Sequence, residues 1–289
     1  MFELKPNHLI KVERTQKVAF TLLSLAAAFT VLLLFAILFY VMSQGLSVIS
    51  LEFLLDSPRS MGEEGGVFPA IVGTIYLIAL VILIAAPIGI GTAVYLNEYI
   101  SDGPFKSTIR FATEILAGIP SIIHGMFGFL FFVILLADYT GGWSILSGAL
   151  TGVIMILPII IRASEEALRS VPDELKHGSL ALGTTRWYTI KKVVLPIAIP
   201  GITTSIILSI GRVIGETAAF LLTLGGSLLL ATSVFDGART LSLHLYLVAM
   251  ETGNTEMAFG SGAILIVLIL IINMAAAGIF KFLVNRFSA

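Results

Sequence analysis

Two ionisable side chains, Arg212 and Glu216, lie in the stretch SIGRVIGET, inside an apolar run that extends from residue 197 to 224. A guanidinium at mid-membrane costs roughly 2.5–3.5 kcal/mol even on the mildest insertion scale, so it must face water or protein. Its planar, permanently charged fork matches two oxygens of a phosphate-like anion. We therefore expect Arg212 to meet an oxyanion, with Glu216 neutralising the charge when no anion is present.

The alternative is an ion pair that only holds helices together. The two residues are four positions apart, which brings their side chains within reach on a helix. Buried ion pairs are weak evidence for stability, because desolvating both charges offsets their attraction. The sequence alone leaves both interpretations open.

A helical wheel divides the run 197–224 into three faces. At 100° per residue the polar side chains fall on one stripe, which we predict to be the substrate pathway: Ser205, Ser209, Arg212, Glu216 and Thr223. A second face is predicted to meet lipid: Ile206, Ile207, Ile210, Val213, Ile214 and Leu221. Gly211 and Gly215 form a Gly-x-x-x-Gly patch, which predicts close packing of another helix.

Composition identifies a membrane protein. Of the 289 residues, 57% are hydrophobic and 12% are charged, and about 20 apolar residues in a helix cross a bilayer. We predict an all-α, polytopic fold with about six transmembrane helices, at residues 18–42, 67–95, 108–136, 144–162, 197–224 and 259–281. The first run is too long for a cleaved signal peptide. Pro87, Pro120 and Pro158 lie in or near spans and predict bends.

Lysine and arginine concentrate in alternate connections. They precede the first span, flank the second connection, fill the fourth connection and follow the last span, whereas the other connections hold only Arg59 and Arg239. The positive-inside rule therefore places both termini in the cytoplasm. We divide the chain into an N-terminal segment with the first span and an outer loop (1–66), a transmembrane domain (67–283) and a short tail (284–289).

Several kinds of chemistry are excluded. The chain has no Gly-x-x-x-x-Gly-Lys-Ser/Thr phosphate loop, no His-Glu-x-x-His and no Gly-x-Ser-x-Gly. The histidines at 8, 124, 177 and 244 form no ligand cluster, so we expect no metal site and no catalytic residue, and we expect His124 to be a hydrogen-bonded helix residue. The absence of cysteine excludes disulfides, and the net charge of −1 gives no reason to expect a nucleic-acid partner.

The connection 163–196 predicts two short helices. Pro172 suits the first turn of one and Gly183 its stop, while Thr184 or Thr185 caps the other, which Pro196 ends. Together they predict a compact knob, which either docks a cytoplasmic partner or packs its apolar side chains on the chain's own helices. On the opposite side, the run 241–250 is too short to span and predicts a re-entrant or interfacial helix.

The knob carries a family resemblance. The stretch HGSLALGTTRWYTIKKVVLP, residues 177–196, resembles the signature of importer-type ABC permeases: Glu-Ala-Ala, three residues, Gly, nine residues, Ile-x-Leu-Pro. Gly183, Leu195 and Pro196 match at the right spacing, whereas the opening triplet and the isoleucine are replaced. The resemblance implies that these residues dock on an ATPase subunit: His177, Gly178, Ser179, Leu180, Ala181, Leu182, Gly183, Leu195 and Pro196.

Other stretches narrow the resemblance. IGIGTAVYLNEYI, LAGIPSIIHGMFGF and GRVIGETAAFLLTLGG are similar to the phosphate-specific permeases of that family, and the last is closer to the PstA branch than to PstC. The resemblance covers about residues 67–283 and implies the type I ABC permease fold, with Arg212 in phosphate passage. It also implies three kinds of partner: a PstC-like permease, two copies of a PstB-like ATPase and a PstS-like phosphate-binding protein.

These observations predict a non-catalytic permease subunit of an ATP-driven phosphate importer in a bacterial inner membrane. It would form half of the translocation pathway and bind no cofactor, with ATP and Mg on the separate ATPase. The alternatives are the paralogous PstC subunit, a sulfate or molybdate permease, a secondary anion transporter and a scaffold subunit. The predicted docking knob favours the ATP-driven class, because a secondary transporter has no need of one.

Overall fold

The computed structural model describes the backbone of residues 6–288 and the side chains of residues 15–278. Residues 1–5 of the predicted N-terminal segment and Ala289 of the predicted tail lie outside the described residues. So do the side chains of four basic residues on which the predicted orientation partly depends: Lys11, Arg14, Lys281 and Arg286.

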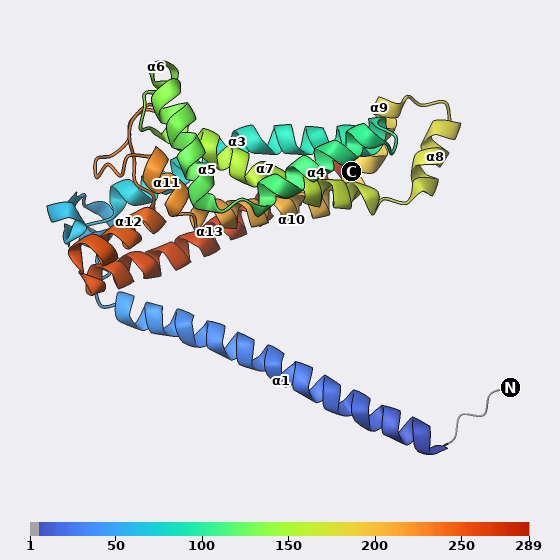
Figure 1. Ribbon diagram of the computed structural model, residues 1–289, viewed down its shortest axis with the longest axis horizontal. Coiled ribbons are helices and arrows are strands. Elements are labelled where there is room, and N and C mark those ends of the chain that lie inside the picture. The colour runs from blue at the N-terminus through green and yellow to red at the C-terminus, as the bar shows by residue number, and fades with distance from the viewer. Residues whose placement is uncertain (1–5, 289) are drawn as a thin grey trace.

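Long helices form a bundle, with short elements at both of its ends (Figure 1). The first half contains α1 (Pro6–Gly45), α2 (Leu51–Leu55), β1 (Pro58–Arg59), η1 (Ser60–Gly62), β2 (Glu64–Gly65), α3 (Phe68–Val94), η2 (Tyr95–Tyr99), α4 (Pro104–Gly118), α5 (Ser121–Gly128), η3 (Phe129–Leu135) and α6 (Ala137–Thr140). The second half contains α7 (Ile145–Arg169), α8 (Asp173–Ala181), α9 (Arg186–Thr189), η4 (Ile190–Val194), α10 (Leu195–Ile214), α11 (Ala218–Thr223), α12 (Leu241–Leu247), η5 (Val248–Thr252) and α13 (Thr255–Ser288).

The core lies between α3, α7 and α10. Leu77 of α3 and Ile156 of α7 are fully buried there, and Ile210 of α10 is 6% exposed. Because lipid is as apolar as these side chains, close helix contact in a membrane depends on small residues. Gly89 of α3 is one of them, since a Cβ added there would lie 2.6 Å from the Cγ2 of Ile160 in α7.

The predicted membrane architecture is confirmed. Among the described residues, five helices are long and apolar enough to cross a membrane, and a bent helix pair brings the number to six if it counts as one span. That pair is α4 with α5 and η3, which meet at 100°, so the third predicted span is not one straight helix. Ile119 and Pro120 separate them with ψ of 130° and 141°. The extended ψ of Ile119 is expected, because a residue before proline avoids the helical region.

The fifth predicted span has different ends in the structure. A continuous helical run from Arg186 to Ile214 passes through Pro196, where we expected a helix to stop. The turn before this proline is the π-helical η4, in which the N–H of Leu195 bonds to the carbonyl of Ile190, so the run is locally irregular where the proline removes a backbone donor. At the other end, α10 stops at Ile214, ten residues before the predicted end of the span at residue 224, and α11 begins only at Ala218.

The predicted lipid face of this span is wrong at four of its positions. Ile206, Ile210, Val213 and Ile214 are at most 6% exposed. They are covered because α10 packs this side against the core helices. Leu221, in α11, is 38% exposed.

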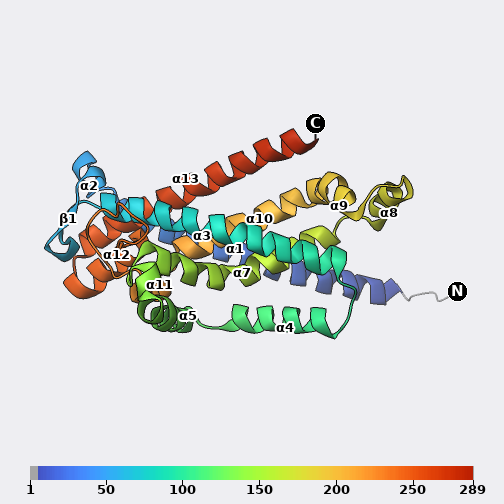
Figure 2. The ribbon, with the colours of Figure 1, turned by 90° about the horizontal axis from the view of Figure 1, so that it is seen from above.

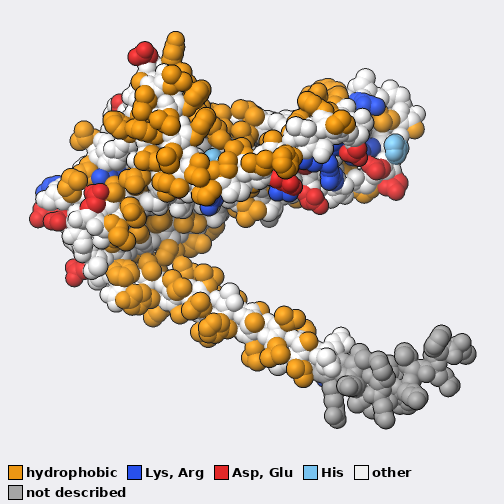
Figure 3. Space-filling view, viewed as in Figure 1, with side chains coloured by type: hydrophobic (Ala, Val, Ile, Leu, Met, Phe, Trp, Pro, Cys, Tyr) orange, Lys and Arg blue, Asp and Glu red, His pale blue; other side chains and the backbone are white. Residues whose placement is uncertain are grey.

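Helix α1 diverges from the bundle (Figure 1). In its most apolar window no residue is buried, and hydrophobic side chains lie along its visible face (Figure 3). It contacts α13 near its C-terminal end, where the rings of Tyr40 and Phe259 meet edge to face at 5.6 Å. Gly45 lies directly against the backbone carbonyl of Phe259.

The predicted loop 43–66 contains α2 and a two-residue hairpin in which β1 pairs antiparallel with β2. The predicted short helix in the run 241–250 is confirmed as α12, whose Leu241 and Leu243 are fully buried. We call this end of the bundle the α12 end. The opposite end carries α8 (Figure 2).

Replacing Gly89 by leucine is expected to destabilise the bundle, because the new side chain would overlap Ile160. Overpacking typically costs about 1–3 kcal/mol, which thermal unfolding in detergent would record as a lower Tm. Gly91→Leu is the matched control, since a Cβ at Gly91 has no neighbouring atom within 4 Å. A Gly89→Leu protein as stable as the control would contradict the close approach of α3 and α7.

Candidate functional site

Arg212 and Glu216 lie on either side of the end of α10. The Arg212 side chain is 49% exposed, whereas that of Glu216 is 5% exposed. The Nη2 of Arg212 and the Oε2 of Glu216 are 3.7 Å apart. The predicted contact is therefore confirmed as a loose ion pair, although the helix ends between the two residues.

Glu216 is held by two further groups. Its Oε1 accepts a hydrogen bond of 3.2 Å from the backbone N–H of Ala219, in the first turn of α11. Its backbone carbonyl accepts a hydrogen bond of 2.9 Å from the hydroxyl of Ser242, in α12. Glu216 thus joins the ends of three helices, while about half of the Arg212 side chain stays uncovered.

The polar stripe that we predicted for this span is divided between exposed and buried positions, and its part in a substrate pathway stays a prediction. Ser205, Ser209 and Thr223 are fully buried, and each hydroxyl donates to a backbone carbonyl of its own helix, at 2.7, 2.8 and 3.0 Å. In this conformation they have no surface with which to touch a substrate. The wheel failed because it assumed one unbroken helix and equated polarity with exposure.

The exposed side of α10 is a row of residues four positions apart: Pro200, Thr204, Leu208 and Arg212. We call this row the open face of α10. Gly211 and Gly215 border it, and a Cβ at Gly211 would meet no atom within 4 Å. The predicted glycine patch therefore has no partner helix within the described part of the chain.

The predicted knob is present at the end opposite α12, where α8 and α9 project from the bundle (Figure 1). Gly183 follows α8 with a φ of 78°, as expected for a glycine that stops a helix. Thr185 caps α9 by accepting a hydrogen bond of 3.3 Å from the N–H of Tyr188.

The predicted docking residues fall into two groups. Residues 177–183 lie together on the knob, with Leu182 85% exposed, whereas Leu195 and Pro196 lie apart from them in the first turn of α10. None of the residues of α8 is buried. The interpretation in which its apolar side chains pack on the chain's own helices is therefore wrong, and the knob presents them outward, as it does the 60%-exposed Trp187.

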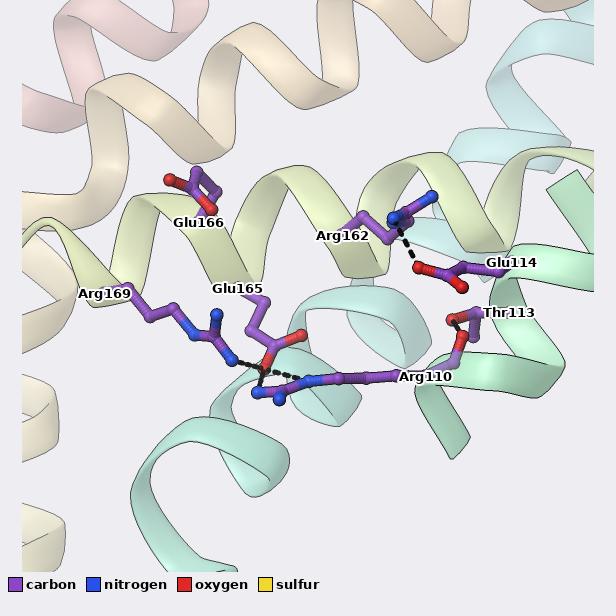
Figure 4. Close-up of a pocket in the computed structure, with 7 residues that line it drawn as sticks. All are labelled: Arg110, Thr113, Glu114, Arg162, Glu165, Glu166 and Arg169. Atoms are coloured by element: carbon purple, nitrogen blue, oxygen red, sulfur yellow. Dashed lines mark hydrogen bonds and ion pairs between the residues drawn. The ribbon is translucent and has the colours of Figure 1, made fainter. Parts of the chain in front are cut away.

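A cluster of opposite charges between α4 and α7 was not predicted as a site (Figure 4). Glu165, 6% exposed, accepts hydrogen bonds from Arg110 of α4 at 3.1 Å and from Arg169 at 3.0 Å. Arg162 donates to Glu114 of α4 at 2.8 Å. These ion pairs join α4 to α7. Because carboxylates already pair the arginines, the cleft of about 230 Å³ beside them offers no surplus positive charge to an anion.

A second unpredicted cluster lies at the α12 end. Arg239 is 5% exposed, its Nε donates to the carbonyl of Gly226 at 3.0 Å, and its Nη1 has no hydrogen-bond partner among the residues that the structure describes. His244 is 1% exposed, and burial, followed by the nearby charge of Arg239, lowers the pKa of its imidazole to about 4. We expect this histidine to be neutral at physiological pH.

The expected hydrogen bond of His124 is absent. The side chain is 5% exposed in α5, and neither ring nitrogen has a partner in the described structure. Within the described residues, no group of three or more His, Asp or Glu side chains is placed to hold a metal ion.

The fold and these sites define a class: a multi-pass membrane protein with one charged residue on the open face of a span and a projecting knob at one end. Residues 85–289 match the family described as "Binding-protein-dependent transport system inner membrane component". The chain belongs to this family.

Two relatives and one solved structure show how far the likeness extends. The probable ABC transporter permease protein YqgI of Bacillus subtilis is 36% identical, over 91% of this chain and 94% of its own length. The phosphate transport system permease protein PstA 1 of Mycobacterium tuberculosis strain H37Rv is 40% identical, over 77% of this chain and 71% of its own length. A chain of a bacterial alginate ABC transporter has the same fold, with a TM-score of 0.69 at 16% identity over 95% of this chain and 97% of that chain.

The buried His244 is expected to make stability depend on pH. Its pKa is about 4 in the folded chain and about 6.5 when unfolded, so between these values the unfolded chain binds the extra proton and acid favours unfolding. One pKa unit is worth about 1.4 kcal/mol, so the full effect is roughly 3 kcal/mol. In detergent, the wild-type Tm should fall from pH 7 to pH 4.5 by more than that of His244→Gln. His177→Gln changes a histidine on the exposed knob and is the control, so its Tm should depend on pH as that of the wild type does. A His244→Gln protein whose Tm also depends on pH as the wild type's does would contradict the assignment.

Proposed function

We propose that this chain is the permease subunit of an ATP-driven phosphate importer. The observation that carries the proposal is the half-exposed guanidinium of Arg212 on an open face of a membrane span. The 40% identity to a protein described as a phosphate transport permease supports phosphate as the cargo. We further propose that the chain lies in a bacterial inner membrane with both termini in the cytoplasm.

The open face of α10 would form one wall of the pathway. A second, PstC-like permease subunit would supply the opposite wall, and the glycines beside Arg212 would let it approach closely. An oxyanion passing between the subunits would accept two N–H bonds from Arg212. Glu216, 3.7 Å from the guanidinium, partly neutralises it when the pathway is empty.

The knob would dock a PstB-like ATPase dimer. ATP and Mg would be held by that partner, since this chain contains no phosphate loop, and a PstS-like protein would deliver phosphate at the α12 end. The continuous helix from Arg186 to Ile214 joins the knob directly to Arg212. At 1.5 Å per residue this connection is about 40 Å long, so a displacement of the knob would reach the guanidinium through one continuous helical run.

Uptake of radiolabelled phosphate by proteoliposomes tests the proposed function. The chain should copurify with an ATPase, and the purified complex should accumulate phosphate only when ATP is supplied. Sulfate, offered in parallel, should be accumulated poorly. Transport by this chain without an ATPase, or a preference for sulfate, would refute the proposal.

Arg212→Lys is expected to lower phosphate uptake while leaving assembly intact, because lysine keeps the charge and loses the planar fork. Loss of a charge-assisted hydrogen bond costs about 1.5–3 kcal/mol, which corresponds to roughly a tenfold or larger drop in rate. Arg162→Lys, altering an arginine that is 56% exposed and paired with Glu114, is the control and should transport normally. Unchanged uptake in Arg212→Lys would favour the interpretation in which the pair only holds helices together.

A further inference from the structure

Helix α8 is held to the rest of the chain by polar contacts. None of its nine residues is buried, and Figure 2 shows it projecting beyond the ends of α3, α4 and α13. A displacement of α8 can therefore reach the bundle through the flanking backbone and through the side chains that α8 bonds.

One set of contacts follows the backbone route. The hydroxyl of Ser179 lies 2.9 Å from the hydroxyls of both Thr184 and Thr189. These threonines precede and end α9, which continues into α10. The hydroxyl cluster thus fixes α8 to the helix that carries Arg212.

A second contact crosses to a different helix. The Nζ of Lys176 in α8 lies 2.9 Å from the Oε1 of Glu98, which is 78 positions away in the sequence. The two side chains are only 15% and 13% exposed. Asn97 donates a hydrogen bond of 2.7 Å to the same oxygen and orients the carboxylate.

Glu98 belongs to a rigid part of the bundle. It lies in η2, which continues α3 without a break, and its neighbour Leu96 is fully buried. Gly89, two turns earlier, is in close contact with Ile160 of α7. A force applied to the Glu98 carboxylate therefore acts on α3 and on its packing against α7.

The shielding of this pair distinguishes it from the exposed pair Arg162–Glu114. Both side chains of that pair are more than half exposed, at a similar N···O distance of 2.8 Å. Exposed pairs contribute little, because water and salt screen them. Removing one partner of a shielded pair leaves the other charge without compensation, so a shielded pair holds its geometry more firmly.

We propose that the Lys176–Glu98 ion pair is a coupling link that transmits displacement of α8 to α3. Lys176 and Glu98 are positioning residues for transport, and neither touches the transported anion. The inference rests on the proposed function in one respect, that α8 receives the movement of an ATPase. With the pair intact, docking movement reaches two core helices: α10 through the backbone and α3 through the pair.

The first test measures coupling in the complete transporter in proteoliposomes. Glu98→Gln and Lys176→Met should keep ATP hydrolysis and lower phosphate uptake per ATP hydrolysed at least about fivefold, the lower end of typical coupling effects. Glu114→Gln, which breaks the exposed pair, is the matched control and should keep the wild-type ratio. The exchanged pair Glu98→Lys with Lys176→Glu should restore the ratio, in an Asp173→Asn background because Asp173 lies 3.7 Å from Lys176.

The second test does not depend on the cargo. The chain contains no cysteine, so spin labels can be attached at Gly91→Cys on α3 and Glu174→Cys on α8, both exposed. In the wild-type complex the label–label distance should stay narrow with and without ATP, because the two elements move together. In Lys176→Met the distribution should broaden or shift when ATP is added.

The possible results separate the two proposals. Distances that behave alike in wild type and Lys176→Met would overturn the coupling link, as would an unchanged transport ratio or loss of the assembled complex in the single variants. An exchanged pair that remains uncoupled would also overturn it. Absence of phosphate uptake by the wild-type complex would instead refute the proposed function, and the label distances would still decide the link.

Discussion

The cost of removing a guanidinium from water is the constraint on which the rest of this structure depends. Arg212 is 49% exposed, while Val213 and Ile214, the next residues in the same helix, are each 1% exposed. One side of α10 is thus sealed against the core and the other is left uncovered. A charge placed there must meet water or another protein surface, so the two sides of this helix face different surroundings.

The end of α10 beside that charge is stabilised locally. Backbone groups released by a helix break inside a membrane need partners, and at this break the Glu216 carboxylate accepts from the N–H of Ala219 while Ser242 donates to the Glu216 carbonyl. The break therefore adds no unpaired group at these positions. It also holds the carboxylate still beside a guanidinium that retains room to turn.

Hydropathy was sufficient to predict the all-α fold and the approximate position of each span, because the bilayer demands apolar length whatever the details of packing. It could not predict that α10 ends at Ile214, since Gly215 and Thr217 are compatible with a helix. The wheel placed Ser205 and Ser209 beside Arg212, yet both hydroxyls bond their own backbone and are buried. A polar side chain need not be exposed when it can donate its hydrogen bond to the backbone of its own helix.

Contacts between residues far apart in the sequence could not be predicted, for another reason. Glu165 and Arg169 are four positions apart, but nothing in that spacing shows that Arg110 of α4 shares the same carboxylate. Lys176 and Glu98 are 78 positions apart and in different helices. By contrast, the stop of α8 at Gly183 and the cap of α9 at Thr185 were predicted, because a capping threonine and a stopping glycine act on backbone groups only a few residues away.

Helix α1 takes little part in the packing of the bundle. Its most apolar window, between Thr15 and Gly45, contributes no buried side chain, so the remaining helices complete their interior without it. It contacts α13 near its C-terminal end, through Tyr40 and Gly45. The family match begins at residue 85 and so leaves α1 out; it falls on the part of the chain where the helices share an interior.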